Sequence, residues 1–306
     1  MSKKVVESVS EVAVELIAKP PVYGNGIIRW FDKTPPSIVC PHFWELNWAY
    51  GCRFECAYCY LQGTLRGNKK PRHKPVGEVL ASLDRFFREQ SEPQILNSGE
   101  LTDSMVFPQI IKRISDKFEM QDKHKLLIVT KSANIGVLLD KPRKQTIFSF
   151  SVNASETWRR WEHKTPSPEA RIKAAKAANA LGDEVRIRID PIFPVEGWRE
   201  SYEDLIYTLL TEFAPERVTL GTPRGLAKTL MYAKDRSWSM VFQGGEKTGW
   251  GWKIAPDVRI EIYGFLYDRL VELGMDKRKI ALCKETVDMW RHLGLNPRTV
   301  RCNCVW

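Results

Sequence analysis

Three cysteines at C-x3-C-x2-C spacing place the strongest constraint on this chain. Cys52, Cys56 and Cys59 come just after the strand-like run 42–47 and lie among aromatic residues and glycines. Three thiolates on one tight loop can hold an iron–sulfur cluster, and a four-iron cube with three cysteine ligands keeps one iron without a protein ligand. Open positions on metals are where chemistry happens. The triplet therefore predicts a cluster-bearing loop with a catalytic metal position.

Other uses of the cysteines fit the sequence less well. A structural zinc loop would need a fourth Cys or His at knuckle spacing, and none follows closely. A disulfide framework is disfavoured because seven cysteines is an odd number and the N-terminus does not read as a secretory signal. The segment 12–18 is apolar but far too short to span a membrane. We therefore expect a protein of the reducing cytoplasm.

The hydrophobic pattern predicts an α/β fold. With 306 residues and 43% hydrophobic content, the chain can bury a substantial core. Strands are expected at 43–47, 94–97, 125–130, 146–151, 184–189 and 217–220, and helices at 77–88, 107–118, 167–181, 201–213 and 256–273. Such alternation is typical of βα units around a parallel sheet with right-handed crossovers. Functional residues are then expected at the carboxyl ends of the strands.

The residues around the triplet carry a family resemblance. Residues 56–62 read Cys-Ala-Tyr-Cys-Tyr-Leu-Gln, and the spacing resembles that of radical S-adenosylmethionine (SAM) enzymes, in particular the spore photoproduct lyase branch. The resemblance extends over about residues 40–213. It implies a [4Fe-4S] cluster on the triplet and a partial (β/α)6 barrel. We expect an N-terminal extension at 1–39, the barrel core at 40–222, and a C-terminal region with a hairpin and helices at 223–306.

Motifs at three predicted strand ends resemble the SAM contacts of that family. The tripeptide 98–100 is similar to the family's Gly-Gly-Glu motif, and the Thr-Lys at 130–131 and the Ser-x-Asn at 151–153 also resemble family elements. Read alone, each could be an ordinary turn or a solvated strand end. The residues carried over as SAM contacts are Ser98, Gly99, Glu100, Lys131, Ser151 and Asn153.

The resemblance also implies a reaction. The reduced cluster gives one electron to SAM, which releases methionine and a 5′-deoxyadenosyl radical, while the protein positions the target C–H and excludes water. In the lyases the target is a thymine dimer in DNA, which implies a base flipped from its stack. An electron donor such as flavodoxin or ferredoxin is an expected partner, and no membrane is.

Charge and aromatic residues indicate a nucleic-acid partner. The net charge of +10 favours a polyanion, and tryptophans among cations suit phosphate contact beside base stacking. The glycine-rich segment 238–253 resembles the hairpin with which the lyases wedge into a duplex. Trp158 and Trp161, however, could equally face the core, and basicity does not distinguish DNA from RNA. The candidate contacts are Arg66, Lys69, Lys70, Arg159, Arg160, Trp250 and Trp252.

One departure from the family concerns the hydrogen donor. The lyases carry a donor cysteine in Glu-Cys-Thr-Asp, whereas residues 100–103 here read Glu-Leu-Thr-Asp, and Leu101 cannot return a hydrogen atom. Tyr58 and Tyr60 match tyrosines on the family's radical return path. Cys302 and Cys304 could replace the missing thiol. With Cys283 and Cys40 they could instead ligate a second metal, or they could be incidental thiols.

Three functions follow as hypotheses. The first is isomerisation of an amino-acid-adducted thymidine in phage DNA hypermodification, a cycle that needs no donor cysteine; the protein would then work in the host cytoplasm. The second is photoproduct repair with a relocated hydrogen donor. The third is a non-enzymatic DNA-binding protein with a structural cluster, which would leave residues 98–100, Lys131 and Ser151 without a ligand.

Overall fold

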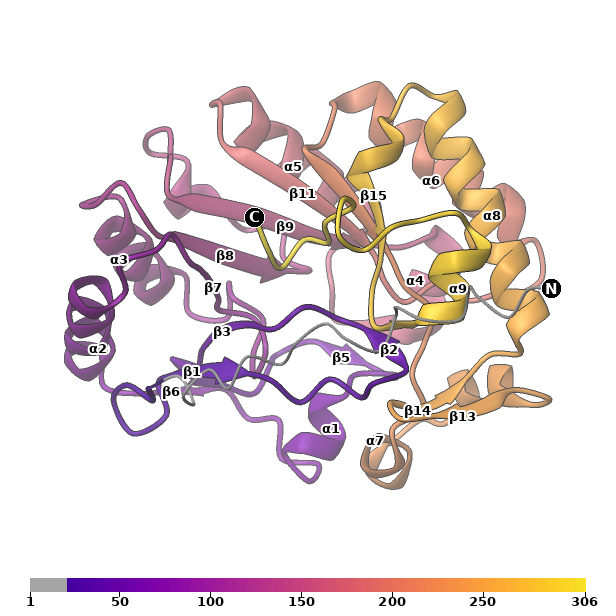
Figure 1. The fold of residues 1–306 in the computed structure, drawn as a ribbon, viewed down its shortest axis with the longest axis horizontal. Coiled ribbons are helices and arrows are strands. Elements are labelled where there is room, and N and C mark those ends of the chain that lie inside the picture. The colour runs from indigo at the N-terminus through magenta and orange to yellow at the C-terminus, as the bar shows by residue number, and fades with distance from the viewer. Residues whose placement is uncertain (1–20) are drawn as a thin grey trace, which may run out of the picture.

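An eight-stranded sheet forms the centre of the computed structural model, which describes residues 21–306 (Figure 1). Its order is β1-β3-β7-β8-β9-β11-β12-β15. Strand β1 pairs antiparallel with β3, and all other neighbours pair parallel. The bounds are β1 Ile28–Phe31, β3 Phe43–Leu46, β7 Ile95–Asn97, β8 Lys125–Thr130, β9 Thr146–Val152, β11 Glu184–Ile189, β12 Arg217–Leu220 and β15 Ile280–Leu282. The predicted α/β fold with parallel strands is confirmed.

Five long helices cover the outside of the sheet, close to where the sequence predicts them. They are α2 Val76–Glu89, α3 Pro108–Phe118, α5 Pro168–Ala180, α6 Trp198–Glu212 and α8 Pro256–Glu272. Helix α5 begins where the sequence requires, since the Ser167 side chain accepts a hydrogen bond from the backbone NH of Ala170 and Pro168 takes the first turn. Helix α6 begins three residues earlier than predicted, after Gly197, whose φ of 68° suits glycine.

Shorter elements connect these units and carry much of the site. The short helices are α1 Leu61–Thr64, α4 Ser155–Trp161, α7 Ala227–Tyr232 and α9 Val287–His292. The 3-10 turns are Gly136–Leu138, Ser237–Phe242 and Lys277–Lys279. The small antiparallel pairs are β2 Ile38–Val39 with β16 Glu285–Thr286, β4 Ala49–Tyr50 with β6 Arg72–His73, β5 Glu55–Cys56 with β10 Glu162–His163, and β13 Glu246–Thr248 with β14 Gly251–Lys253.

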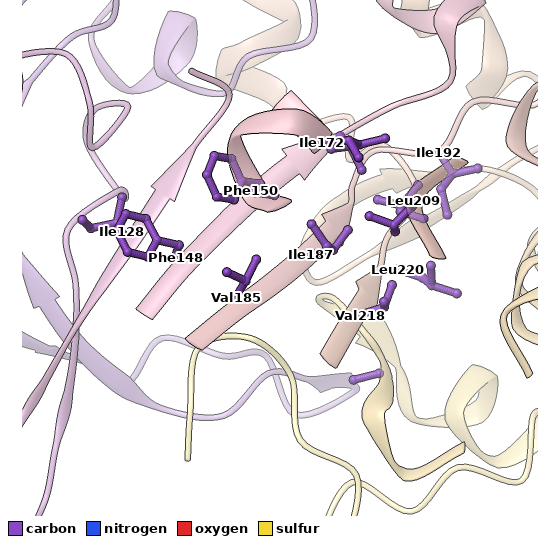
Figure 2. Close-up of a cluster of buried hydrophobic side chains, with 14 of the residues drawn as sticks. Ile128, Phe148, Phe150, Ile172, Val185, Ile187, Ile192, Leu209, Val218 and Leu220 are labelled. Carbon is purple, nitrogen blue, oxygen red and sulfur yellow. The ribbon is translucent and has the colours of Figure 1, made fainter. Parts of the chain in front are cut away.

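The two faces of the sheet differ, since one is apolar and the other carries most of the buried polar residues of the strands. Figure 2 shows apolar side chains of β8, β9, β11 and β12 packed with Ile172 of α5 and Leu209 of α6. Because side chains alternate along a strand, the residues between them point to the other face. On β9 and β11 these include Ser149, Arg186 and Arg188, all buried. The same face also carries a small apolar cluster of Ile95, Leu127 and Ile147, so the interior of the partial barrel combines polar and apolar side chains.

Two edge strands lie outside the six predicted ones. Strand β1 lies within the predicted N-terminal extension, and β15 lies in the predicted C-terminal region. Residues 1–20 of that extension, including the apolar segment 12–18, lie outside the described residues. The division at residues 39 and 222 stays a prediction. None of the helices in residues 21–306 has both the length and the apolar character needed to cross a bilayer.

The predicted glycine-rich hairpin is present as β13 and β14. It follows a 3-10 turn in which Trp238 is fully buried. The backbone of Trp252 exchanges hydrogen bonds with Gly225, at N–O distances of 2.8 and 3.1 Å, so the hairpin is tied to the segment that follows β12. Helix α7, which precedes the hairpin, packs closely on α1, next to the cysteine loop (Figure 1).

Candidate active site

A cavity of about 420 Å³ lies at the carboxyl ends of the parallel strands. This is the end of a βα barrel where active sites form. The cavity gathers predicted residues that are far apart in the sequence. Those that line it are Cys56, Tyr58, Cys59, Tyr60, Gly99, Glu100, Lys131, Ser151, Trp250, Cys302 and Cys304.

The cysteine loop is shaped by glycine and by backbone hydrogen bonds. Gly51 has a φ of 82°, and a Cβ at this position would lie 2.6 Å from the carbonyl oxygen of Lys69. The backbone NH of Cys52 donates to that same carbonyl at 3.0 Å. Only glycine fits such a close approach at positive φ, so the sequence around the triplet fixes the loop.

The three thiols suit a cluster with one open corner. Cys56 and Cys59 line the 420 Å³ cavity, while Cys52 and Cys56 line an adjoining cavity of about 600 Å³. In the part of the chain that the structure describes, no three His, Cys, Asp or Glu side chains converge where one metal ion could bind. A four-iron cube instead takes each thiolate at a different iron. Three thiols on one loop are the donor set that such a cluster takes when one iron has no protein ligand.

A buried carboxylate, Glu162, organises the cavity wall. Its Oε1 accepts hydrogen bonds from the Tyr58 hydroxyl, from Lys131 Nζ at 3.0 Å and from Asn153 Nδ2 at 3.1 Å. Its Oε2 lies 2.6 Å from Arg171 Nη1. Although burial opposes ionisation, Lys131 and Arg171 hold the pKa of Glu162 at about 2. The ionised carboxylate thus fixes the tyrosine and the lysine together.

Glu162 is a site residue that sequence reasoning missed. It pairs with Cys56 between β5 and β10, so it lies directly beside the cysteine loop. In the sequence it stands inside the segment 158–164, whose tryptophans and cations read as a DNA contact. The sequence feature that could have pointed to Glu162 is that it is the only acid among these cations and directly follows Trp161, which is buried.

The turn at 99–103 is joined to the cysteine loop. The backbone NH of Gly51 donates to Leu101 O at 2.9 Å, and the Thr102 hydroxyl donates to Gly51 O at 2.7 Å. The Tyr60 hydroxyl donates to the carbonyl of Glu100. Leu101 lines the cavity. The position that carries a thiol in the resembling lyases is therefore at the cavity wall, and it holds leucine here.

The Glu100 carboxylate is held towards the cavity. Asn97 Nδ2 donates to Glu100 Oε1 at 2.9 Å, and Asn97 Oδ1 accepts from the NH of Gly99 at 2.9 Å. A Cβ at position 99 would lie 2.6 Å from the Cβ of Val129. Glycine is thus required for the strand-end turn to pack against β8.

Two of the predicted SAM contacts do not reach the cavity with their side chains. Ser98 is buried, and its hydroxyl bonds to Ser104 Oγ and Leu127 O, both at 2.8 Å. Asn153 is buried, donates to Pro191 O at 2.9 Å and accepts from the Tyr202 hydroxyl at 2.7 Å. Their hydrogen-bonding groups are used inside the protein, so these two side chains support the site from behind.

The tryptophans of the hairpin differ from each other. Trp250 stacks on Phe31 with ring centres 6.0 Å apart, and Lys284 Nζ lies 4.8 Å from the centre of the Trp250 ring. Trp250 is half-buried and forms part of the cavity wall, and its contact with DNA stays a prediction. Trp252 is 42% exposed, as predicted.

The predicted basic contacts are only partly free for phosphate. Lys69 Nζ donates to Phe54 O at 2.7 Å, which anchors the cysteine loop. Arg159 and Arg160 are exposed on α4 and both pair with Glu156, at 2.8 and 2.6 Å. Lys70 lines the 600 Å³ cavity.

Two further predictions near α4 and α1 can be compared with the structure. Arg66 follows α1 and has a φ of 50°. Trp161 is buried, with its indole NH 2.9 Å from Ser237 Oγ. Trp158 donates to the Thr165 hydroxyl at 3.1 Å. Of the two predictions for these tryptophans, DNA contact or a place in the core, the place in the core is correct for Trp161.

Comparison with known proteins agrees with this geometry. The family model described as Spore photoproduct lyase matches residues 29–221. Spore photoproduct lyase of Bacillus subtilis (strain 168) is 31% identical over 185 residues, which cover 58% of this chain and 53% of that protein. An uncharacterized protein of Acidianus two-tailed virus is 23% identical over 220 residues, covering 64% and 71%. The chain spans about half the length of the lyases that it matches.

Solved structures show the same fold. Spore photoproduct lyase complexed with dinucleoside spore photoproduct superposes with a TM-score of 0.67 at 19% identity, covering 82% of this chain and 78% of that one. A mutant of the same enzyme with bound AdoMet and dinucleoside spore photoproduct gives 0.67 at 20% identity. From the family match over residues 29–221, we conclude that this chain belongs to the spore photoproduct lyase family of radical SAM proteins.

Proposed function

We propose that this protein is a radical SAM enzyme that removes a hydrogen atom from a thymine-derived base in DNA. The observation that carries the proposal is the shared cavity, where Cys56 and Cys59 face Glu100, Lys131 and Tyr58. Cys52, Cys56 and Cys59 would hold the cluster, and the turn at 99–100 with Ser151 would receive SAM. When bound, cluster and SAM together supply a 5′-deoxyadenosyl radical.

The residues of the chain have three tasks in this proposal. Glu162 holds Tyr58 and Lys131 in fixed positions through buried hydrogen bonds. The cavity walls would shield a radical from water once SAM and the base fill the space. The stack of Trp250 on Phe31 offers an aromatic surface for a flipped base, and Lys284 adds a cation beside it.

The substrate class is supported by the relatives. Both lyase structures named above contain dinucleoside spore photoproduct, and the chain shares their fold. The basic residues Lys69, Lys70 and Lys234 line the adjoining cavity of about 600 Å³, which also contains Cys52. A basic surface beside the cluster loop suits an acidic electron donor such as flavodoxin or ferredoxin.

A second candidate function rests on Leu101. A cycle in which the hydrogen taken from the substrate returns to the same molecule needs no thiol at this position. Isomerisation of an amino-acid adduct on the thymine methyl carbon is such a cycle, and DNA hypermodification would be its setting. The cysteines in the cavity instead favour repair with a relocated hydrogen donor.

Nucleoside mass spectrometry separates the two candidates. The reconstituted protein is incubated without oxygen with SAM, a reductant and one of two DNAs, carrying either spore photoproduct or 5-aminoacylmethyl pyrimidine. Thymidine recovered from the first DNA supports repair. A product of unchanged mass and shifted retention from the second supports isomerisation. If neither DNA changes while SAM is cleaved, the proposed base substrate is wrong.

Leu101→Cys is expected to increase repair. The substitution places a thiol at a cavity wall beside the cysteine loop, where it can give a hydrogen atom to a substrate radical. We expect more thymidine per molecule of SAM cleaved on photoproduct DNA. Leu101→Ala, which adds space and no thiol, is the control. An equal yield from both variants would contradict a hydrogen-donor role for this position.

Trp252→Ala is expected to weaken binding to duplex DNA without affecting the fold. The side chain is 42% exposed, while its backbone keeps the bonds to Gly225. Loss of one stacking contact costs about 1–3 kcal/mol, or roughly 5- to 150-fold in Kd. Fluorescence anisotropy measures this, with Met240→Ala, 65% exposed just before the hairpin, as the control. Unchanged affinity of Trp252→Ala would remove the hairpin from the DNA-binding surface.

A further inference from the structure

The C-terminal tail of the chain lies inside the partial barrel, against the inner face of β9, β11 and β12. In Figure 1 the tail, in yellow, crosses in front of β9 and β11. Asn303 is fully buried there. Its Nδ2 donates to Ser149 Oγ at 3.1 Å and to Ile187 O at 2.9 Å, and its Oδ1 accepts from Thr219 Oγ1 at 2.8 Å. Three strands thus hold the residue between the two cysteines.

Backbone contacts on both sides complete this anchoring. Arg186 Nη1 donates to Asn303 O and Val305 O, both at 2.8 Å, and Arg217 Nη1 donates to Cys302 O at 3.1 Å. The indole NH of Trp306 donates to Pro93 O at 3.2 Å. The tail is therefore anchored to the barrel by specific hydrogen bonds. Cys302 and Cys304 line the same cavity as the cysteine loop.

Arg188 points to Cys304 and, among residues 21–306, forms no ion pair with a carboxylate. Its Nη2 donates to Cys304 Sγ at 2.9 Å and its Nε donates to Ser149 Oγ at 3.2 Å. The fully buried arginines differ, since each of them pairs with a carboxylate: Arg143, Arg171, Arg186 and Arg259. Asp190 acts on Arg188 through its charge, but it forms its ion pair with Arg224, at 2.8 Å. A buried cation needs a compensating charge, and the sulfur of Cys304 is placed to provide it.

The two thiols differ in protonation. The hydrogen bond from Cys302, helped by Arg188 and opposed by burial and by the Glu100 carboxylate, lowers the pKa of Cys304 to about 6. The hydrogen bond to Cys304 and burial raise the pKa of Cys302 well above its ordinary value. These opposite directions favour the thiolate at Cys304, whose sulfur lies 2.9 Å from Arg188 Nη2, and the thiol at Cys302. Cys40, another cysteine of the cavity, has a pKa raised to about 12 by burial.

We propose that Cys302 is the hydrogen-atom donor of this enzyme and that Cys304, paired with Arg188, is its thiolate partner. This inference rests on the proposed function. The S–H bond of Cys302 breaks, and its hydrogen atom bonds to the carbon radical left on the substrate. The unpaired electron stays on the Cys302 sulfur, where the adjacent thiolate shares it. The sulfur regains hydrogen from the 5′-position of deoxyadenosine, so no external oxidant or reductant is consumed.

The thiolate can be tested without cofactor or substrate. The purified full chain is alkylated with iodoacetamide between pH 4.5 and pH 9, and the C-terminal peptide is quantified by mass spectrometry. We expect Cys304 to react with a midpoint near pH 6, and Arg188→Met to move this midpoint up towards that of an ordinary thiol. A midpoint near that of an ordinary thiol in the wild type, unchanged by Arg188→Met, would overturn the pairing.

The donor role is tested by deuterium transfer. Protein equilibrated in D2O carries S–D groups, so the first product molecule should contain one solvent deuterium. Cys302→Ser keeps the size of the side chain but offers an O–H bond too strong to break. We expect this variant to form 5′-deoxyadenosine while losing the deuterated product, and Cys40→Ala to keep it. Leu101→Cys in the Cys302→Ser background should restore the labelled product.

The outcomes separate this inference from the proposed function. The donor assignment is overturned if deuterated product persists in Cys302→Ser, or if it disappears in Cys40→Ala instead. Either result leaves the proposed function intact. Unlabelled product in the wild type also overturns it, and points to direct return of the substrate hydrogen. Absence of 5′-deoxyadenosine from the fully loaded wild type contradicts the proposed function itself.

Discussion

Serine at position 52, 56 or 59 is expected to abolish SAM cleavage. Each thiolate of the triplet would ligate a different iron, and a cluster with two protein ligands is not retained. Reconstituted protein should hold roughly four irons per chain, and each variant should hold close to none and form no detectable 5′-deoxyadenosine. Iron analysis and chromatography of the nucleoside product measure both effects.

The other cysteines of the cavity provide the control. Cys40→Ser and the double variant Cys302→Ser/Cys304→Ser change thiols that line the same cavity but lie outside the triplet. We expect both to keep the iron content of the wild type. Iron lost from the double variant would mean that the tail ligates metal, and would contradict the assignment of the cluster to the triplet alone.

Replacement of Glu162 is expected to have the largest effect on stability. Glu162→Ala leaves Lys131 and Arg171 without their buried counter-charge, and removal of one partner from such a group costs about 3–5 kcal/mol. SAM cleavage should fall as well, because Tyr58 and Lys131 lose their common acceptor. Urea denaturation of the full chain measures the free energy of unfolding.

Glu156→Gln is a matched control for this prediction. Glu156 also binds two cations, Arg159 and Arg160, but all three side chains are solvent-accessible. Exposed pairs contribute about 0–1 kcal/mol, so we expect a small change. Equal losses from Glu156→Gln and Glu162→Ala would show that burial of the Glu162 group has no special role.

The Glu162 group also predicts a pH dependence. Its pKa falls from the ordinary 4.5 to about 2 in the folded protein, which corresponds to roughly 3 kcal/mol. A depressed folded-state pKa stabilises the protein above the unfolded-state value, and this stabilisation is lost as the pH falls. The difference in unfolding free energy between wild type and Glu162→Gln should therefore shrink by about 2 kcal/mol between pH 6 and pH 3. A constant difference would contradict the ionised state of Glu162.

Much of the fold could be read from the sequence because its signals are local. The strands at 125–130, 184–189 and 217–220 are short segments rich in β-branched and apolar residues, and each has the predicted bounds in the structure. Ser167 and Pro168 mark the start of helix α5 in the sequence. The family motifs lie at strand ends. Local pattern and backbone structure agree at these places.

The parts that the sequence did not predict depend on long-range contacts. Glu162 acquires its role only when Lys131, Arg171 and Tyr58 converge from separate elements. Strand β15 is three residues long, too short for a periodic signal, and it forms by pairing with β12. The place of Trp250 in the cavity wall depends on its stacking against Phe31, which is far away in the sequence. Such contacts depend on tertiary packing rather than on sequence spacing.

The most direct test of the central claim follows one hydrogen atom. The fully loaded protein is incubated without oxygen with SAM and with DNA whose thymine-derived base is deuterated at ring C6 and at the carbons of its 5-substituent. Mass spectrometry then measures the 5′-deoxyadenosine that is formed. We predict 5′-deoxyadenosine that carries deuterium from the base. Its formation without deuterium from either photoproduct or aminoacylmethyl DNA, or no formation at all, would contradict the claim that this cavity abstracts hydrogen from a thymine-derived base.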